Sequence, residues 1–182
     1  GCVFGEAHFP GELGCTPIGA DCPTGVYADG LPSDTPVVRV SADAAPGGDG
    51  TMSAPFDSLS AARLSSQASG TTVALGKGSY QGTLALRAGV AVWGACVAET
   101  RVTDVPEAVV SVATVTSAGP GAELRNLAIV DPPQGGVSVE MGRSLALEGV
   151  LITGAAGGVA ARDRGTTVEA SRLVVFCPRA LA

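Results

Sequence analysis

The sequence has few aromatic residues, one lysine and one histidine, and each scarcity narrows what the protein can be. Aromatics make up 4% of the 182 residues, so alanine, valine and leucine supply the hydrophobic surface. Eleven scattered Lys and Arg residues and a formal net charge of −6 argue against a nucleic acid partner. No apolar run approaches the roughly 18 residues of a membrane-spanning helix, so no transmembrane segment is expected.

Metal-binding spacing is also missing. The five cysteines form no CxxC pair, and only His8 could assist them, so no metal or other cofactor is expected. His8 has no serine, aspartate or cysteine at a spacing that indicates a catalytic triad. What the chain does contain is glycine, with 26 residues, and an apolar fraction of 46%, which together favour a folded domain with many tight turns.

The most informative pattern is a repeat in the last third of the chain. An apolar pattern recurs twice at a constant 23-residue offset: Ala122-x-Leu124-x-x-Leu127-x-Ile129, Leu145-x-Leu147-x-x-Val150-x-Ile152 and Val168-x-Ala170-x-x-Leu173-x-Val175. A fixed period of this size indicates stacked repeats, and alternation within each unit indicates strands. The sequence therefore predicts an all-β fold, a single-stranded parallel β-helix of about four to five coils, right-handed like most parallel crossovers.

A second series supports the later coils. Gly135-Gly136-Val137-Ser138-Val139 is followed about one period later by Gly157-Gly158-Val159-Ala160-Ala161, which predicts a second strand in each coil after a glycine corner. Upstream, strands are expected at 72–75 and 84–86, with 90–92 closing the first coil. The 23-residue register fails before Ala122, so an irregular coil, with strand character at Val109, Val110, Val112 and Val115, is expected there.

Residues 1–36 are expected to be irregular, and the β-helix domain to span 37–182, beginning with a strand at 37–40. A helix from Asp57, as its N-cap, to about residue 69 is predicted to cover the exposed first coil. The last strand precedes Cys177 with no further capping pattern, so we expect either a longer protein or a partner at that edge.

Cysteine placement indicates export. Cys2, Cys15 and Cys22 all lie near the start of the chain, which is typical of a disulfide-tied segment, and Cys15 with Cys22 is the candidate bridge. Cys96 and Cys177 are separated by more than three periods of the repeat, which places them several coils away from each other and excludes a bond. Gly1-Cys2 resembles the end of a bacterial lipoprotein signal, so Cys2 is a candidate lipid anchor; an ordinary cysteine is the alternative.

A family resemblance emerges from the first half of the chain. Several segments are together similar to the opening of right-handed parallel β-helix proteins of the pectin-lyase-like superfamily: the stretch 46–51, Ala54-Pro55-Phe56, the expected helix, Val73-x-Leu75, Gly78-x-Tyr80 and Val90-x-Val92-x-Gly94. The uncharacterised bacterial envelope or secreted members are the most similar. The resemblance covers about residues 37–177 and implies an exported β-helix, located outside the cell or in the envelope. It does not imply an enzyme.

Candidate site residues are few. Arg125 and Glu148 occupy equivalent outward positions in adjacent coils, where a surface ion pair is the simplest interpretation and ligand contact the alternative. Tyr80 and Trp93 are candidate sugar contacts, although each could merely cover the core beside a glycine corner. Asp43, together with Asp49, is a weak candidate for Ca²⁺, because aspartate is common in turns.

The sequence shows no paired carboxylates at the spacing that glycoside hydrolysis requires, so no catalytic residue is assigned. We expect a non-catalytic domain with a structural, adhesive or glycan-presenting role, whose partners would be glycans or other cell-surface components. One alternative is a fragment of a polysaccharide lyase or glycoside hydrolase. Another is an assembly module that pairs edge to edge.

Overall fold

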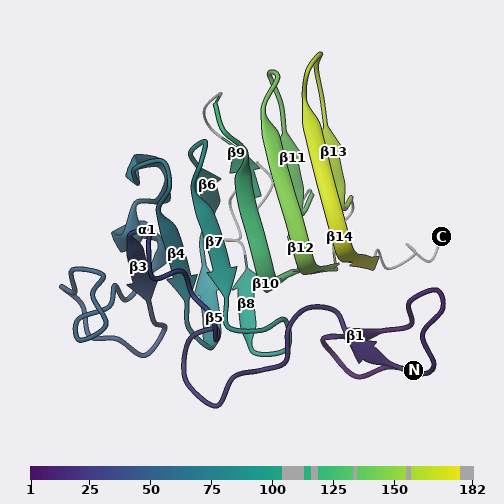
Figure 1. Cartoon of the computed structure of the whole chain (residues 1–182), viewed down its shortest axis with the longest axis horizontal. Helices are drawn as coiled ribbons and strands as arrows, with labels where there is room; N and C mark the ends of the chain where they lie inside the picture. Colours follow the sequence, from purple (N-terminus) through teal and green to yellow (C-terminus); the bar gives the residue numbers. More distant parts are fainter. Residues whose placement is uncertain (104–112, 116–118, 133–134, 155–156, 177–182) are drawn as a thin grey trace.

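The computed structural model, which describes residues 1–103, 113–115, 119–132, 135–154 and 157–176, is a parallel β-solenoid of about four turns (Figure 1). The predicted all-β architecture is confirmed. The right-handed sense of the coil stays a prediction. Two predictions fall outside the described residues: the strand character at 109, 110 and 112, and the absence of a capping pattern in 177–182.

The largest sheet takes strands from successive turns, all parallel. Its order is β3 (Val37–Val40), β4 (Thr72–Leu75), β7 (Ala91–Gly94), β10 (Ala122–Val130), β12 (Ser144–Thr153) and β14 (Thr167–Phe176). The short strand β5 (Gly78–Gln81) pairs with β8 (Thr100–Thr103), and β8 pairs with the second half of β10. A second sheet stacks β6 (Leu84–Leu86), β9 (Ala113–Val115), β11 (Val137–Val139) and β13 (Val159–Ala161).

The predicted 23-residue register is confirmed residue by residue. Leu124 pairs with Leu147 and Leu147 with Ala170, while Val150 lies between Leu127 and Leu173. The inward side chains of β10 and β12 are almost fully buried, and burial of each large aliphatic contributes about 1.5–3 kcal/mol. The second series is confirmed as well, because Val137 pairs with Val159 across β11 and β13.

Earlier turns have other lengths, which explains why the register fails before Ala122. Trp93 on β7 pairs with Arg125 on β10, a longer step along the chain than the regular period, whereas the step from Ala74 on β4 to its partner Trp93 is shorter. The expectation that residues 90–92 close the first coil is wrong. Strand β7 lies directly beside β4 and so begins the next turn, because β5 and β6 have already completed the circuit.

The predicted capping helix is wrong in length and in its cap. Helix α1 covers only Leu59–Ala62 and is followed by a 3-10 turn, η1 (Leu64–Ser66). Ser58, not Asp57, is the N-cap: its hydroxyl accepts the Ala61 N–H at 3.2 Å. A full-length helix is not needed, since the buried side chains of Leu59, Ala62 and Leu64 already join the core of the first turn beside β3 and β6.

The opposite end of the stack is open among the described residues. No described strand pairs with the outer edge of β14, and the Val175 and Phe176 side chains are 41% and 63% exposed. Within the same part of the chain, no helix is long and apolar enough to span a membrane.

Candidate functional site: a cleft under the N-terminal segment

Each of the last three turns bends at the same position of the repeat. Asn126, Gly149 and Arg172 have positive φ angles of 54°, 58° and 48° and occupy the two-residue gap between inward positions. A left-handed residue turns the strand without breaking the ladder on either side. The double gap in the repeat motif is thus a corner, and the corner residues form a column along one side of the solenoid.

The N-terminal segment, residues 1–36, lies along this column. Its only described strands, β1 (Glu6–Ala7) and β2 (Thr16–Pro17), form a small antiparallel pair near β12 and β14, and the chain then runs beneath the stack (Figure 1). The backbone N–H of Ala20 donates to the Asn126 side-chain oxygen at 3.0 Å. Next to it, a Cβ added to Gly149 would lie 2.5 Å from the Cα of Gly19, so only glycine fits this contact.

Arg172 binds the part of the N-terminal segment between Glu12 and Pro17. Its guanidinium pairs with the Glu12 carboxylate at 3.0 Å and donates to the Pro17 carbonyl at 2.8 Å. The hydrogen bond from Thr16, and after it the contact with Arg172, lowers the pKa of the Glu12 carboxyl. Three successive corner residues therefore all bind the N-terminal segment.

Apolar packing adds to these polar contacts. The Ile18 side chain, 1% exposed, joins Val97, Ala128 and Leu151 in a small cluster outside the main core. Ala128 and Leu151 point outward from the solenoid, so this part of the sheet would present an apolar surface to water without the N-terminal segment. The irregular segment is consequently a structural part of the fold.

Disulfides tie the segment together, but in a different pairing from the predicted one. Cys2 pairs with Cys15, and Cys22 pairs with Cys96. The predicted Cys15–Cys22 bridge is wrong because the chain passes over the solenoid between these positions, which brings Cys22 to the turn after β7. The sulfur atom of Cys2 is bonded to Cys15 in this structure, and a lipid anchor on Cys2 stays a prediction. Two groups with metal-ligating side chains, Cys2-His8-Cys15 and Cys22-Cys96-Glu99, include these bonded cysteines.

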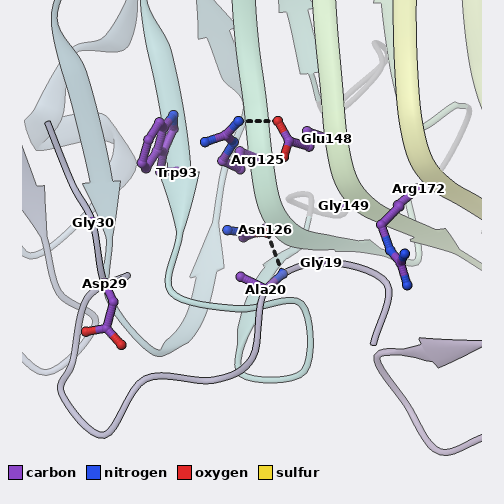
Figure 2. A pocket seen from close by; sticks show the side chains of 10 residues that line it. All are labelled: Gly19, Ala20, Asp29, Gly30, Trp93, Arg125, Asn126, Glu148, Gly149 and Arg172. Atoms are coloured by element: carbon purple, nitrogen blue, oxygen red, sulfur yellow. Dashed lines mark hydrogen bonds and ion pairs between the residues drawn. The ribbon is translucent and has the colours of Figure 1, made fainter. Parts of the chain in front are cut away.

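Between the N-terminal segment and the outer face of the large sheet lies a cleft of about 430 Å³. The sheet side provides Trp93 from β7, Arg125 from β10 and Glu148 from β12, which follow one another in register (Figure 2). The corner residues and the loop residues complete the wall: Gly19, Ala20, Asp29, Gly30, Asn126, Gly149 and Arg172. Three of the four predicted ligand-contact residues thus line one concave site.

Arg125 is the centre of this arrangement. Its guanidinium carbon lies 4.4 Å from the centroid of the Trp93 ring, and its Nε is 3.1 Å from a Glu123 carboxylate oxygen. The predicted ion pair with Glu148 is present (Figure 2). The guanidinium is therefore held between two carboxylates and an indole face, an arrangement that fixes its orientation.

Trp93 also presents an unsatisfied donor. Its indole N–H is buried and has no hydrogen-bond partner among the described residues. A buried donor without a partner costs free energy. The rest of the ring is partly accessible, so Trp93 offers an apolar surface to a ligand.

Tyr80 does not belong to this site, and its prediction as a sugar contact is wrong. The side chain is 3% exposed and lies in the main core, where its hydroxyl donates toward the carbonyls of Gly76 at 2.9 Å and Val40 at 3.2 Å. Burial, as the largest influence, strongly raises the pKa of the phenol. Tyr80 thus acts as a core residue with a satisfied hydroxyl.

The two weak calcium candidates lie before and within the turn of residues 46–51. The Asp49 side chain accepts the backbone N–H of Thr51 at 3.0 Å, and hydrogen bonding with Thr51 lowers the pKa of its carboxyl. Asp49 therefore stabilises the turn through its side chain, which is a common role of aspartate in turns. Neither Asp43 nor Asp49 belongs to a described cluster of three ligating side chains.

Sequence reasoning missed Asn126, Gly149 and Arg172 as a functional column. The available signal was the residue type in the double gap of the repeat, since asparagine and glycine are the residues that tolerate a left-handed corner.

No protein-family model matches the chain, and neither the curated proteins nor the solved structures compared with it give a significant match.

Proposed function

We propose that the protein is a non-catalytic β-helix domain of an exported bacterial protein that binds glycans in the cleft beside Trp93. The observation that carries the proposal is the convergence of Trp93, Arg125 and Glu148 in a concave site of about 430 Å³. An aromatic surface with flanking charged hydrogen-bonding groups fits the mixed apolar and hydroxyl surface of a pyranose. A structural or adhesive role would follow from presenting this cleft on a stiff solenoid.

The bacterial envelope or the extracellular space is the proposed location. Two disulfides support it, because such bonds persist in oxidising compartments. Membership of the pectin-lyase-like superfamily remains part of the proposal and is supported by the parallel β-solenoid and by the glycine-rich opening and capping turn of residues 46–66.

The glycan proposal is tested with Trp93→Ala on a glycan array, followed by calorimetry with the best ligand. Truncation of a central aromatic contact typically costs about 2 kcal/mol or more, so we expect affinity to fall by at least about tenfold. Phe4→Ala is the matched control, because Arg101 lies over the Phe4 ring at the same 4.4 Å but outside the cleft. Unchanged affinity in Trp93→Ala, with the parent fold retained by circular dichroism, contradicts the proposal.

The glycans that bind also allow a test of the enzyme alternative, a polysaccharide lyase or glycoside hydrolase. Each glycan that binds is incubated with the parent protein, and new reducing ends or unsaturated products are sought by mass spectrometry. Turnover that disappears in Glu148→Gln would establish a catalytic role in place of the binding role.

The open edge of β14 favours a second candidate, self-assembly. Val175 and Phe176 are exposed apolar residues on this strand, and its outer hydrogen-bonding groups meet no described strand. If two copies pair here, light scattering at high concentration detects dimers in the parent and monomers in Phe176→Asp. Met141→Asp is the control, since Met141 is 67% exposed but precedes β12 at a turn. A monomeric parent at millimolar concentration rules assembly out.

A further inference from the structure

The charge of the cleft bears on which glycans it accepts. Two guanidiniums, Arg125 and Arg172, contribute to its wall. Arg125 is paired with both Glu123 and Glu148, and Arg172 is paired with Glu12. Each positive charge is thus already matched or exceeded by carboxylates of the protein itself, so neither guanidinium is free to bind an acidic sugar bidentately.

Asp29 adds a further negative charge. It lines the cleft from the N-terminal segment, opposite the sheet (Figure 2). Its carboxylate has no hydrogen-bond or ion-pair partner among the described residues. The two guanidiniums and the four carboxylates, Glu12, Glu123, Glu148 and Asp29, leave the cleft and its immediate contacts with a net charge of −2. A carboxylate-bearing ligand would meet repulsion from this field.

Hydrogen-bond chemistry points the same way. The carboxylates of Asp29 and Glu148 line the cleft as acceptors and require donors. Glu148 is paired with Arg125, but its side chain is 49% exposed, so it has acceptor capacity left for a ligand. The C6 hydroxyl of a neutral sugar can donate to these carboxylates, whereas the C6 carboxylate of a uronate only accepts.

We propose that the cleft between the N-terminal segment and strands β7, β10 and β12 selects uncharged, hydroxyl-rich sugar units and discriminates against uronic acids. The inference rests on the proposed glycan-binding function and names its ligand class. The selected ligands differ from the acidic polysaccharides that a polysaccharide lyase would be expected to take. Selectivity arises from carboxylates that the fold places there and from guanidiniums that are already neutralised.

The test uses pairs of oligosaccharides that differ only at C6, as CH₂OH or as carboxylate, in the gluco, manno and galacto series. Affinity for each member is measured by calorimetry with the full chain at low and at high salt. We expect the neutral member of the bound pair to bind at least about tenfold more tightly at low salt. Salt should narrow the difference by strengthening uronate binding, because it screens the repulsion, while neutral binding stays nearly constant.

A charge variant provides an independent readout. Asp29→Asn combined with Glu148→Gln removes two negative charges and releases Arg125 from one partner, so uronate affinity should rise by at least about tenfold relative to the neutral member. Asp34→Asn is the control, because Asp34 is an exposed aspartate of the same segment that does not line the cleft. A parent-like ratio of the two affinities in the control shows that overall charge is not the cause.

The outcomes are distinguishable. Trp93-dependent binding in which the uronate member is equal or tighter overturns the selectivity while leaving glycan binding intact. Absence of binding by every pair overturns both. A preference for the neutral member that neither salt nor the double variant changes also overturns the inference, since the carboxylates would then play no part in it.

Discussion

Replacing Val150 by aspartate is expected to destabilise the fold severely. Val150 is fully buried between Leu127 and Leu173 in the inward column, so the substitution removes a core aliphatic and places a carboxylate among aliphatic neighbours. The lost burial costs about 2 kcal/mol, and an unpaired buried charge adds several more. The total is comparable to the whole stability of a typical domain, about 5–15 kcal/mol.

Thermal unfolding followed by circular dichroism measures this effect. We expect Val150→Asp to be unfolded or to melt at least about 10 °C below the parent. Burial should raise the pKa of the introduced carboxyl above its unfolded value, so the deficit is largest at neutral pH and shrinks as the pH falls toward about 4. Val150→Ala isolates the lost packing, and Thr167→Asp places the same charge at an exposed position of β14. A parent-like melting temperature for Val150→Asp would refute its core position.

The core could be predicted because successive turns of a solenoid place apolar residues at equivalent positions. The same apolar positions recur with a 23-residue period, so each inward residue is specified three times, and a register error would place polar residues such as Glu123 or Glu148 inside. The ion pair between Arg125 and Glu148 followed from the same period. Where the period changed, between Trp93 and Arg125, the prediction lost its register and misassigned the turn to which residues 90–92 belong.

The cleft could be predicted only in part. Its sheet side lies on the repeat, so Trp93, Arg125 and Glu148 were within reach of a sequence argument. Its other side comes from Gly19, Ala20 and Asp29, in a segment without any period, whose position depends on contacts with residues far away along the chain. Local patterns do not encode such contacts. The same non-local path explains why the predicted Cys15–Cys22 bridge is wrong. Cysteines that are close in sequence need not be close in space when the chain between them passes across several turns.

Removing the Cys22–Cys96 disulfide is expected to produce the second large effect. The bond closes a loop with a sequence separation of 74 residues, and the loss of unfolded-state entropy on closing a loop of that size is worth about 4 kcal/mol. The Cys22→Ser/Cys96→Ser variant should therefore melt about 10 °C lower. The bond also joins the N-terminal segment to the turn after β7, between the Ala20 and Asp29 parts of the cleft wall, so glycan binding should fall with it.

Hydrogen exchange at the Ala20 amide distinguishes release of the segment from a general loss of stability. This N–H is held by the Asn126 side chain alone at the outer corner, so it should exchange faster in Cys22→Ser/Cys96→Ser while the inward strand amides of β10 and β12 stay protected. Cys2→Ser/Cys15→Ser is the control, because that bond closes a separation of only 13 residues within the segment. In this control variant the packing of Ile18 and the contacts of Arg172 still hold the segment, so the Ala20 amide should remain protected. Equal protection of Ala20 in both variants and the parent would mean that the corner contacts hold the segment by themselves, and that the disulfide does not maintain the cleft.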